Sequence, residues 1–441
     1  MYQSKKMLPS CRFISLFLLF IFAPFVQSDE QVLPSATPAS VGMSEIGLNK
    51  INTIVRELID KNRVPGVVTM VARYGKLIHL DSQGYADVEK KTPIGPENIF
   101  RFMSMTKPIT SAAIVMLNDD GLIGLDDPIK KYLPEFANMN VRTAEGLVPA
   151  KGDITIRQLL THTSGLAYSM LPSIVQEDYR KSDVFAVGNR LFETTEAHVK
   201  RLAKLPLMAH PGTVWNYGES MTVLGRLVEV VSGKSFRSFL KERLFDPLGM
   251  QDTDFYVAPE NRERLAQLYE MGSDGVISNI DPSNYGGNYL EKPPLENGGA
   301  GLVGSPRDYL RFALMLMNGG KSNGMQLISS SGIKMLMSDN LPAAVSTDTL
   351  ALSLPWSGVD FGFGFGGSVV VRKESDKSSG SVGEYSWGGW ANTLFWVDPE
   401  QELVELIFTQ VIPASPSPVK LGVELGAAVR RATYDAIVDK R

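Results

Sequence analysis

The chain has 441 residues, of which 44% are hydrophobic and 21% are charged, and its formal net charge is −4. This balance is typical of a soluble globular protein with enough chain for a large buried core. The sequence has no long basic run, so nucleic acid is not expected as its main partner.

The first 28 residues have the layout of a secretory signal. The cationic start, the apolar run and the polar junction are, in order, Lys5, Lys6 and Arg12, then Phe13 to Phe25, then Val26-Gln27-Ser28. The apolar run is short for a membrane span. We therefore predict cleavage after Ser28 and a periplasmic or secreted mature protein, residues 29–441, that is not stably inserted in a membrane. An uncleaved anchor helix is the alternative.

The only cysteine, Cys11, lies inside this removable segment. The mature chain would have no thiol, which excludes disulfides, cysteine-based zinc sites and thiol catalysis. The sequence also shows no paired histidines or acidic cluster at metal-ligand spacing. Neither a metal nor a cofactor is therefore expected.

Hydrophobic periodicity predicts a helix and a hairpin, then a mainly helical stretch, then strands and a closing helix. In chain order the predicted elements are helix Ser44 to Asn62, strands Val67 to Ala72 and Leu77 to Leu80, helices Ile109 to Asn118, Ile156 to Leu160, Thr194 to Leu205 and Ser220 to Val231, strands Gly367 to Val371, Thr393 to Val397 and Leu403 to Phe408, and helix Leu421 to Val438.

This order of elements predicts an α+β fold. Consecutive strands joined by turns indicate an antiparallel sheet, and the helical stretch, roughly residues 102–231, indicates an α-helical lobe inserted into the α/β part of a single domain. The segments Thr143 to Gly152 and Leu171 to Asn189 are predicted to be long loops that shape a site.

Ser104-Met105-Thr106-Lys107 is the strongest local candidate for catalysis. If a helix begins at Ser104, Lys107 shares its face and can reach the serine hydroxyl. A serine hydroxyl is a weak nucleophile that needs a nearby base. A lysine can be that base if burial or a neighbouring cation lowers its pKa. Alone, the pattern is short, and a helix cap followed by a solvated lysine is the alternative.

Further motifs along the chain, in the same order, extend this pattern. They are Leu122 to Pro128 (LIGLDDP), Leu159 to Leu166 (LLTHTSGL), Pro211 to Tyr217 (PGTVWNY), Gly299 to Asn318 with Ser305-Pro306-Arg307-Asp308-Tyr309, and Trp387-Gly388-Gly389. Together they resemble the class C-like branch of the serine β-lactamase and penicillin-binding-protein superfamily, from about Pro34 to the C-terminus. Within it, the chain is most similar to the family VIII carboxylesterases. The resemblance implies a β-lactamase/transpeptidase-like fold, an antiparallel sheet flanked by helices with an all-α lobe.

The resemblance also implies roles for individual residues. Ser104 would be the acylated nucleophile, Lys107 its hydrogen-bonded partner, and Tyr217 the general base in acylation and later a proton shuttle. The backbone N–H groups of Ser104 and Trp390 would form the oxyanion hole. Trp387, Gly388 and Gly389 would line the substrate. A phenol needs a cationic neighbour to ionise near neutral pH, and Lys107 would supply it as one half of a coupled pair.

Two departures from the family pattern bear on the substrate. Trp387 and Gly388 replace the cationic or hydroxyl-bearing residues that help relatives bind a substrate carboxylate, which favours a neutral ester over an anionic β-lactam or D-Ala peptide. Glu219 stands where class C β-lactamases carry an asparagine. We expect Glu219 to be a solvated residue at a helix start, where acids are favoured, and a site carboxylate is the alternative.

The sequence therefore predicts a serine hydrolase that cleaves small neutral carboxylic esters through an acyl-enzyme at Ser104. Alternatives on the same fold are a β-lactamase, a D-Ala-D-Ala carboxypeptidase, an acyltransferase, or a penicillin-binding-like module without turnover. A conventional α/β-hydrolase is disfavoured because no G-x-S-x-G occurs. A Ser-His-Asp triad could draw only on His79, His162, His198 and His210, and the resemblance places His162 in a structural turn.

Overall fold

The computed structural model describes residues 1–2, 33–184, 193–281, 289–347, 358–375, 378–413 and 421–439. The fold lies in the unit Leu33–Arg441. The predicted signal, residues 1–28, lies outside the described residues except for the first two. Its cleavage and the export of the protein therefore stay predictions.

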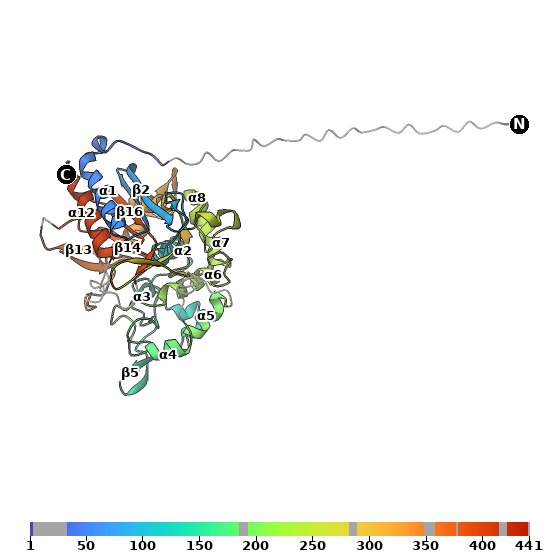
Figure 1. Ribbon diagram of the computed structural model, residues 1–441. Helices are drawn as coiled ribbons and strands as arrows, with labels where there is room; N and C mark the ends of the chain where they lie inside the picture. Colours follow the sequence, from blue (N-terminus) through green and yellow to red (C-terminus); the bar gives the residue numbers. More distant parts are fainter. Residues whose placement is uncertain are drawn as a thin grey trace. The chain divides into compact units, whose positions relative to one another are not determined.

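An antiparallel sheet of eight strands forms the centre of this unit (Figure 1). Its order is β12-β13-β14-β15-β16-β1-β2-β3, and every neighbouring pair is antiparallel. The strands are β1 (Gly66–Arg73), β2 (Lys76–Asp87), β3 (Thr92–Pro93), β12 (Val359–Phe363), β13 (Ser368–Lys373), β14 (Tyr385–Gly388), β15 (Leu394–Asp398) and β16 (Leu403–Phe408). The β1–β16 pairing joins the N-terminal hairpin to the C-terminal strands, so the two ends of the fold build one sheet.

Two helices from opposite ends of the unit pack together beside this sheet (Figure 1). They are α1 (Glu45–Asp60), capped by Ser44 as predicted, and α12 (Ala427–Asp435), which follows a π-helical turn at Gly422–Gly426. Helix α9 (Pro306–Met317) contacts β1, β15 and β16. Strand β1 is buried at all of its positions, as expected for a strand covered on both faces.

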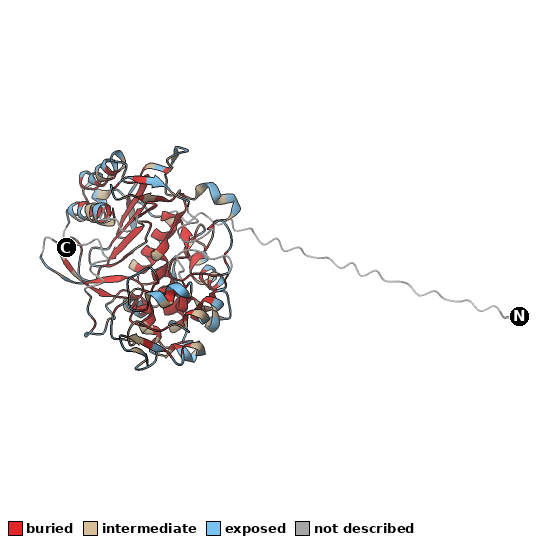
Figure 2. Ribbon diagram, turned by 60° about the horizontal axis from the view of Figure 1, so that its bottom comes forward, coloured by how far each residue is buried: buried red, intermediate tan, exposed pale blue. Residues whose placement is uncertain are grey.

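The helical lobe is organised around α6 (Ser220–Ser232), which contacts α2, α3, α5 and α7. Their bounds are α2 Thr106–Asp119, α3 Ile156–Leu160, α5 Thr195–Leu202 and α7 Phe236–Leu240. Three further short helices are α4 (Gln176–Lys181) and α8 (Asp246–Leu248), both labelled in Figure 1, and α10 (Ser330–Leu336). Helix α2 is buried along almost its whole length, and Figure 2 shows buried residues concentrated in the central helices and strands.

The structure confirms the predicted α+β order and differs in local detail. The segment Thr143 to Gly152 is largely the second half of a hairpin, and the segment Leu171 to Asn189 contains α4 in its described part. A 3-10 turn at Met103–Met105 precedes α2, so the α-helix begins at Thr106 and not at Ser104. The short strands are β4 (Phe100–Arg101) with β9 (Val303–Gly304), β5 (Asn140–Thr143) with β6 (Gly146–Pro149), β10 (Lys321–Ser322) with β11 (Met325–Gln326), and β7 (Tyr269–Met271) with β8 (Ile277–Asn279) and β17 (Val411–Pro413).

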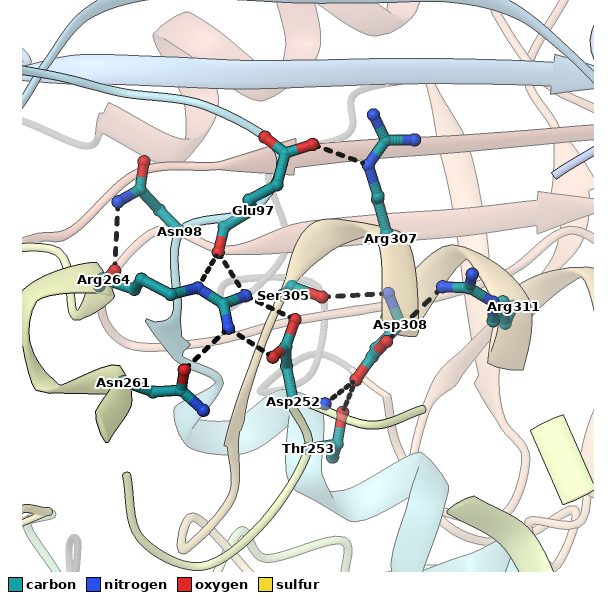
Figure 3. Close-up of polar contacts among 10 residues, drawn as sticks. All are labelled: Glu97, Asn98, Asp252, Thr253, Asn261, Arg264, Ser305, Arg307, Asp308 and Arg311. Atoms are coloured by element: carbon teal, nitrogen blue, oxygen red, sulfur yellow. Dashed lines mark hydrogen bonds and ion pairs between the residues drawn. The ribbon is translucent and has the colours of Figure 1, made fainter. Parts of the chain in front are cut away.

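The motif at the start of α9 makes polar contacts with a neighbouring loop, which Figure 3 shows, and with the nucleophile region through its next residue. Ser305 caps the helix, and its side chain accepts a hydrogen bond from the Asp308 N–H. The Asp308 carboxylate accepts hydrogen bonds from the backbone N–H of Asp252 at 2.8 Å and the hydroxyl of Thr253 at 2.9 Å. The next residue, Tyr309, donates from its hydroxyl to the carbonyl of Met105 at 3.0 Å. The motif therefore supports the turn that carries Ser104.

We expect Asp308→Ala to destabilise the protein by about 2–3 kcal/mol, because it leaves two donors without their acceptor. Burial raises the pKa of Asp308 to about 7, with a further contribution from the Asp252 charge. A carboxyl with a raised pKa favours the folded state most below its unfolded pKa and loses this contribution as pH rises towards 7. The difference in the free energy of unfolding between the wild type and the variant, measured in urea, should therefore decrease from pH 4 to pH 7.

Arg307→Ala is the matched control for this prediction. Arg307 neighbours Asp308 but pairs with Glu97 at the surface (Figure 3). Exposed pairs contribute less than about 1 kcal/mol, so this variant should stay close to the wild type at every pH. Equal losses for the two variants would contradict the role assigned to Asp308.

Candidate active site

Ser104 and Lys107 lie together at the junction of the 3-10 turn and α2. The Lys107 Nζ donates to the Ser104 Oγ at 3.0 Å and to the carbonyl oxygen of Gly299 at 2.7 Å. Met103, directly before the serine, has a φ of 48°, a conformation that costs energy in a residue with a side chain. Such strain is common at functional sites, and here it turns the chain at the point where Ser104 meets the lysine.

The environment of Lys107 suits a proton acceptor. Its side chain is completely buried, and this burial lowers its pKa to about 7, against an opposing effect of the Glu219 carboxylate. Near neutral pH the amine is therefore uncharged in a substantial fraction of molecules. A neutral amine within hydrogen-bonding distance of a serine hydroxyl can accept its proton during nucleophilic attack.

Tyr217 lies beside this pair because the L-L-T-H-T-S-G-L segment holds its neighbours. The Lys107 Nζ is 4.5 Å from the centroid of the Tyr217 ring. Asn216 donates from its backbone N–H to the His162 carbonyl at 2.8 Å and from its amide to the Leu166 carbonyl at 2.7 Å. A Cβ at Gly218 would lie 2.2 Å from the Leu166 carbonyl oxygen, so only glycine fits there. Segments about 50 residues apart in sequence thus fix the phenol against the amine.

The electrostatics of Tyr217 do not favour a phenolate. Burial raises the pKa of its hydroxyl above the usual range, by more than the neighbouring Ser104 and Trp387 side chains lower it. The hydroxyl is buried and makes no well-aligned hydrogen bond with the described residues. Lys107, with its lowered pKa, is therefore better suited than Tyr217 to accept a proton near neutral pH. The family-implied role of Tyr217 as the base stays a prediction.

His162 is buried against the face of Tyr217, with the two ring centroids 4.8 Å apart. Its Nδ1 accepts from the Gly218 N–H at 3.4 Å. Burial and the Lys107 charge lower the pKa of His162 well below its ordinary value. The ring is therefore neutral, and the structure places it as a packing partner of the tyrosine.

Strand β14 brings the Trp387-Gly388-Gly389 segment to the same place. Its pairing with β13 ends at Ser386, whereas Trp387 and Gly388 continue to pair with β15. The ring centroid of Trp387 is 5.6 Å from that of Tyr217. A Cβ at Gly389 would lie 2.3 Å from the Phe102 carbonyl oxygen, so the absence of a side chain lets the end of β14 reach the nucleophile turn.

Trp390 follows at this junction and packs against a small apolar cluster of Met103, Leu268, Ala391 and Ile412. The residue predicted to complete the oxyanion hole therefore packs against the same cluster as the residue that precedes Ser104. The assignment of the Ser104 and Trp390 backbone N–H groups to an oxyanion stays a prediction.

Sequence reasoning missed one side chain and one backbone carbonyl near Lys107, and it misjudged the environment of Glu219. The Tyr168 ring centroid is 5.4 Å from that of Tyr217 and 5.8 Å from the Lys107 Nζ, and the Gly299 carbonyl holds the amine. The prediction that Glu219 is solvated is wrong, because the residue is only 1% exposed. It is the N-cap residue of α6, and at this end of the helix Ser111 of α2 contacts Met221 and His198 of α5 lies beside Glu219. In the sequence, the one feature that pointed to a site carboxylate was the position of Glu219 two residues after Tyr217.

Among the described residues, no group of three or more histidine, cysteine, aspartate or glutamate side chains could hold a metal ion. None of the helices in the described part of the chain combines the length and apolar character needed to cross a bilayer.

Comparisons with known proteins agree with this geometry. A family model described as Beta-lactamase matches residues 51–420. Protein Rv1367c of Mycobacterium tuberculosis is 32% identical over 403 residues, covering 87% of this chain and 97% of that protein. Esterase EstB of Burkholderia gladioli is 29% identical, covering 82% and 89%. The solved structure of EstCE1, a hydrolase with promiscuous acyltransferase activity, is 26% identical with a TM-score of 0.74, covering 88% and 99%.

Proposed function

The chain belongs to the Beta-lactamase family, as a serine ester hydrolase on the β-lactamase fold, and from this premise we propose that Ser104, Lys107 and Tyr217 hydrolyse small neutral carboxylic esters. The observation that carries the proposal is the 3.0 Å hydrogen bond between the Ser104 hydroxyl and the buried amine of Lys107. The predicted β-lactamase-like fold is confirmed by the same comparisons.

The proposed reaction has two halves. In the first, the Ser104 oxygen attacks the ester carbonyl while its proton passes to the neutral Lys107 amine, and the tetrahedral intermediate expels the alcohol, which receives a proton through Tyr217 or Lys107. In the second, a water molecule loses a proton to the same pair, attacks the acyl-serine and releases the acid, and the proton returns to Ser104. The two N–H groups assigned to the oxyanion hole would stabilise both intermediates.

The residues around Tyr217 support a neutral substrate. Trp387 occupies the position where relatives carry a cation, and its ring packs against Tyr217 and, with centroids 5.3 Å apart, against Phe363. Trp215 also packs against the phenol, with nearly parallel rings and a centroid separation of 6.0 Å. An aromatic wall offers apolar area but little attraction to a substrate carboxylate. An uncharged ester gains from such a wall without leaving a buried charge unpaired.

A substrate panel tests the proposal. We expect p-nitrophenyl butyrate to be turned over with a kcat/KM at least about 100-fold above that of nitrocefin, equivalent to about 2.7 kcal/mol of transition-state stabilisation. We expect no release of D-alanine from a D-Ala-D-Ala peptide. Esters from acetate to palmitate measure the acyl length that the site accepts. Nitrocefin hydrolysis as fast as that of the best ester would instead assign the chain to the β-lactamases.

Acyl transfer is a second candidate, favoured by the similarity to EstCE1. An acyl-serine can pass its acyl group to an alcohol in place of water, so the same panel is run with an added alcohol. A new ester in the product mixture would show transfer, and free acid alone would show hydrolysis.

A further inference from the structure

Glu219 is a buried carboxylate that the proposed reaction does not use. Its side chain is 1% exposed and lies at the start of α6, two residues after Tyr217. Its Oε2 accepts a hydrogen bond from the Thr222 hydroxyl at 2.9 Å, whereas its Oε1 has no hydrogen-bond partner among the described residues. A buried carboxylate with one oxygen unsatisfied is costly unless cations lie near it.

Two buried basic side chains, His198 and Lys107, interact with this carboxylate. On α5, the His198 Nε2 is 3.9 Å from the Glu219 Oε2, and the His198 Nδ1 is 3.2 Å from a Glu193 carboxylate oxygen. Burial lowers the pKa of His198, but its interactions with Glu193 and Glu219 outweigh burial and raise it overall. On α2, the Glu219 charge acts on Lys107. The lysine and the imidazolium therefore share one carboxylate.

A chain of polar contacts also leads from Glu219 to the loop that holds Lys107. The single proton of the Thr222 hydroxyl lies between two acceptors, the Glu219 Oε2 at 2.9 Å and the more distant Asn297 Oδ1 at 3.4 Å. This Oδ1 accepts from the N–H groups of Gly299 at 2.7 Å and Ala300 at 3.1 Å. The Gly299 carbonyl in turn accepts from the Lys107 Nζ. Glu219 is thus connected to the lysine site by these contacts as well as by the effect of its charge.

The other titratable groups around the start of α6 do not supply a competing charge. The neutral groups facing it are His162 after α3, Tyr168, Tyr179 on α4 and Tyr217. The remaining charged groups on the packed elements have carboxylate or guanidinium partners: Arg201 with Glu193, Arg226 with Glu196 and Glu229, and Arg237 with Asp254 and, through its backbone N–H, Glu296.

We propose that Glu219 is a positioning residue of the active site, whose carboxylate is the shared counter-charge of Lys107 and His198 and which, through Thr222 and Asn297, steadies the carbonyl that holds the lysine amine. The inference rests on the proposed partnership of Ser104 and Lys107. It predicts that the balance between Glu219 and His198 decides the pH at which Lys107 becomes a base.

Two substitutions should move the pH profile in opposite directions. Glu219→Gln removes an anion near Lys107, which lowers the lysine pKa, so the rising limb of kcat/KM for p-nitrophenyl butyrate should move on the order of one pH unit to lower pH. His198→Gln removes the cation that competes for Glu219, so the limb should move to higher pH. Glu219→Asp keeps the charge and should return the limb towards its wild-type position.

Glu229→Gln is the matched control. Glu229 lies on the same helix, pairs with Arg226 and does not act on the lysine, so its variant should keep the wild-type limb. A merely structural role for Glu219 would lower kcat without moving the limb. Unmoved limbs in both Glu219→Gln and His198→Gln would overturn the inference. If Glu219→Gln does not fold, the pH profile of His198→Gln tests the inference by itself. A rising limb of kcat/KM that stays in place or moves to lower pH in this variant would overturn the inference.

The rate of covalent labelling of Ser104 by a fluorophosphonate, followed against pH, separates this inference from the proposed function. Labelling needs an activated serine but no ester turnover. Shifted labelling limbs with no hydrolysis of any ester would support the role of Glu219 and reject the substrate assignment. Labelling limbs that do not shift, together with rapid ester hydrolysis, would support the substrate assignment and reject the role of Glu219.

Discussion

The Ser104→Ala variant is expected to lose at least about 10³-fold in kcat/KM for p-nitrophenyl butyrate while it keeps its fold, because removing the nucleophile of a covalent mechanism leaves only binding and oxyanion stabilisation. The Ser104 hydroxyl accepts from the Lys107 amine, and the methyl group of alanine is smaller, so no steric clash accompanies the loss. Steady-state kinetics and unfolding in urea measure the two expectations together.

Ser111→Ala is the matched control for this variant. Ser111 lies on the same helix and is fully buried, and among the described residues its hydroxyl has one polar contact, with the Met221 sulfur at 3.9 Å. Its removal should leave kcat/KM within about threefold of the wild type, since its hydroxyl makes no hydrogen bond with Ser104, Lys107 or Tyr217. Full activity of Ser104→Ala would reject the acyl-enzyme proposal. Equal losses in the two variants would show that packing of α2, and not the nucleophile, had been measured.

The fold was predictable where local pattern and tertiary environment agree. The periodic helices at Ser44 and Ile156 and the strand at Leu403 appear within a residue or two of their predicted bounds, because each has a clear apolar face and a defined start. The hairpin of β5 and β6 was missed, since its exposed alternating residues lack an apolar pattern. Strand β14 is only four residues long, and its position is set by its pairing with β15.

The candidate site also has a part that local geometry predicts and a part that depends on tertiary contacts. The contact between Ser104 and Lys107 follows from a spacing of three residues, which local geometry alone can bring together. The approach of Tyr217 follows from the family resemblance, and its physical cause, the backbone contacts of Asn216 and Gly218, is tertiary. The rule that acids at helix starts are solvated failed for Glu219, because it describes an isolated helix end and not one in contact with two other helices.

Lys107→Met is expected to lower kcat/KM for p-nitrophenyl butyrate by about 10³-fold, within the range typical of removing a general base. Methionine matches the length of lysine in a fully buried position but cannot accept a proton or donate to the Gly299 carbonyl. Residual activity should lose the rising limb near pH 7 that the lysine pKa predicts for the wild type. A variant that retains this limb would show that a group other than Lys107 sets it.

The same substitution gives an independent measurement of the lysine environment through stability. The pKa of Lys107 falls from 10.5 to about 7 on folding, so between these values the unfolded chain binds more protons than the folded one. Wild-type stability should therefore rise with pH across this window and stay level, for this group, below pH 7.

Lys107→Met removes that dependence, so its stability relative to the wild type should be greatest near pH 6 and fall by a few kcal/mol towards pH 10. The loss of a counter-charge for Glu219 lowers the variant's stability and reduces the advantage at low pH, but it does not remove the slope, because the slope comes from the lysine alone. Urea unfolding of both proteins at pH 6, 8 and 10 measures the difference, in which other titrating groups largely cancel. Parallel stability curves would mean that the amine is solvated in the folded protein, and a solvated lysine with its ordinary pKa could not serve as the base that Ser104 needs.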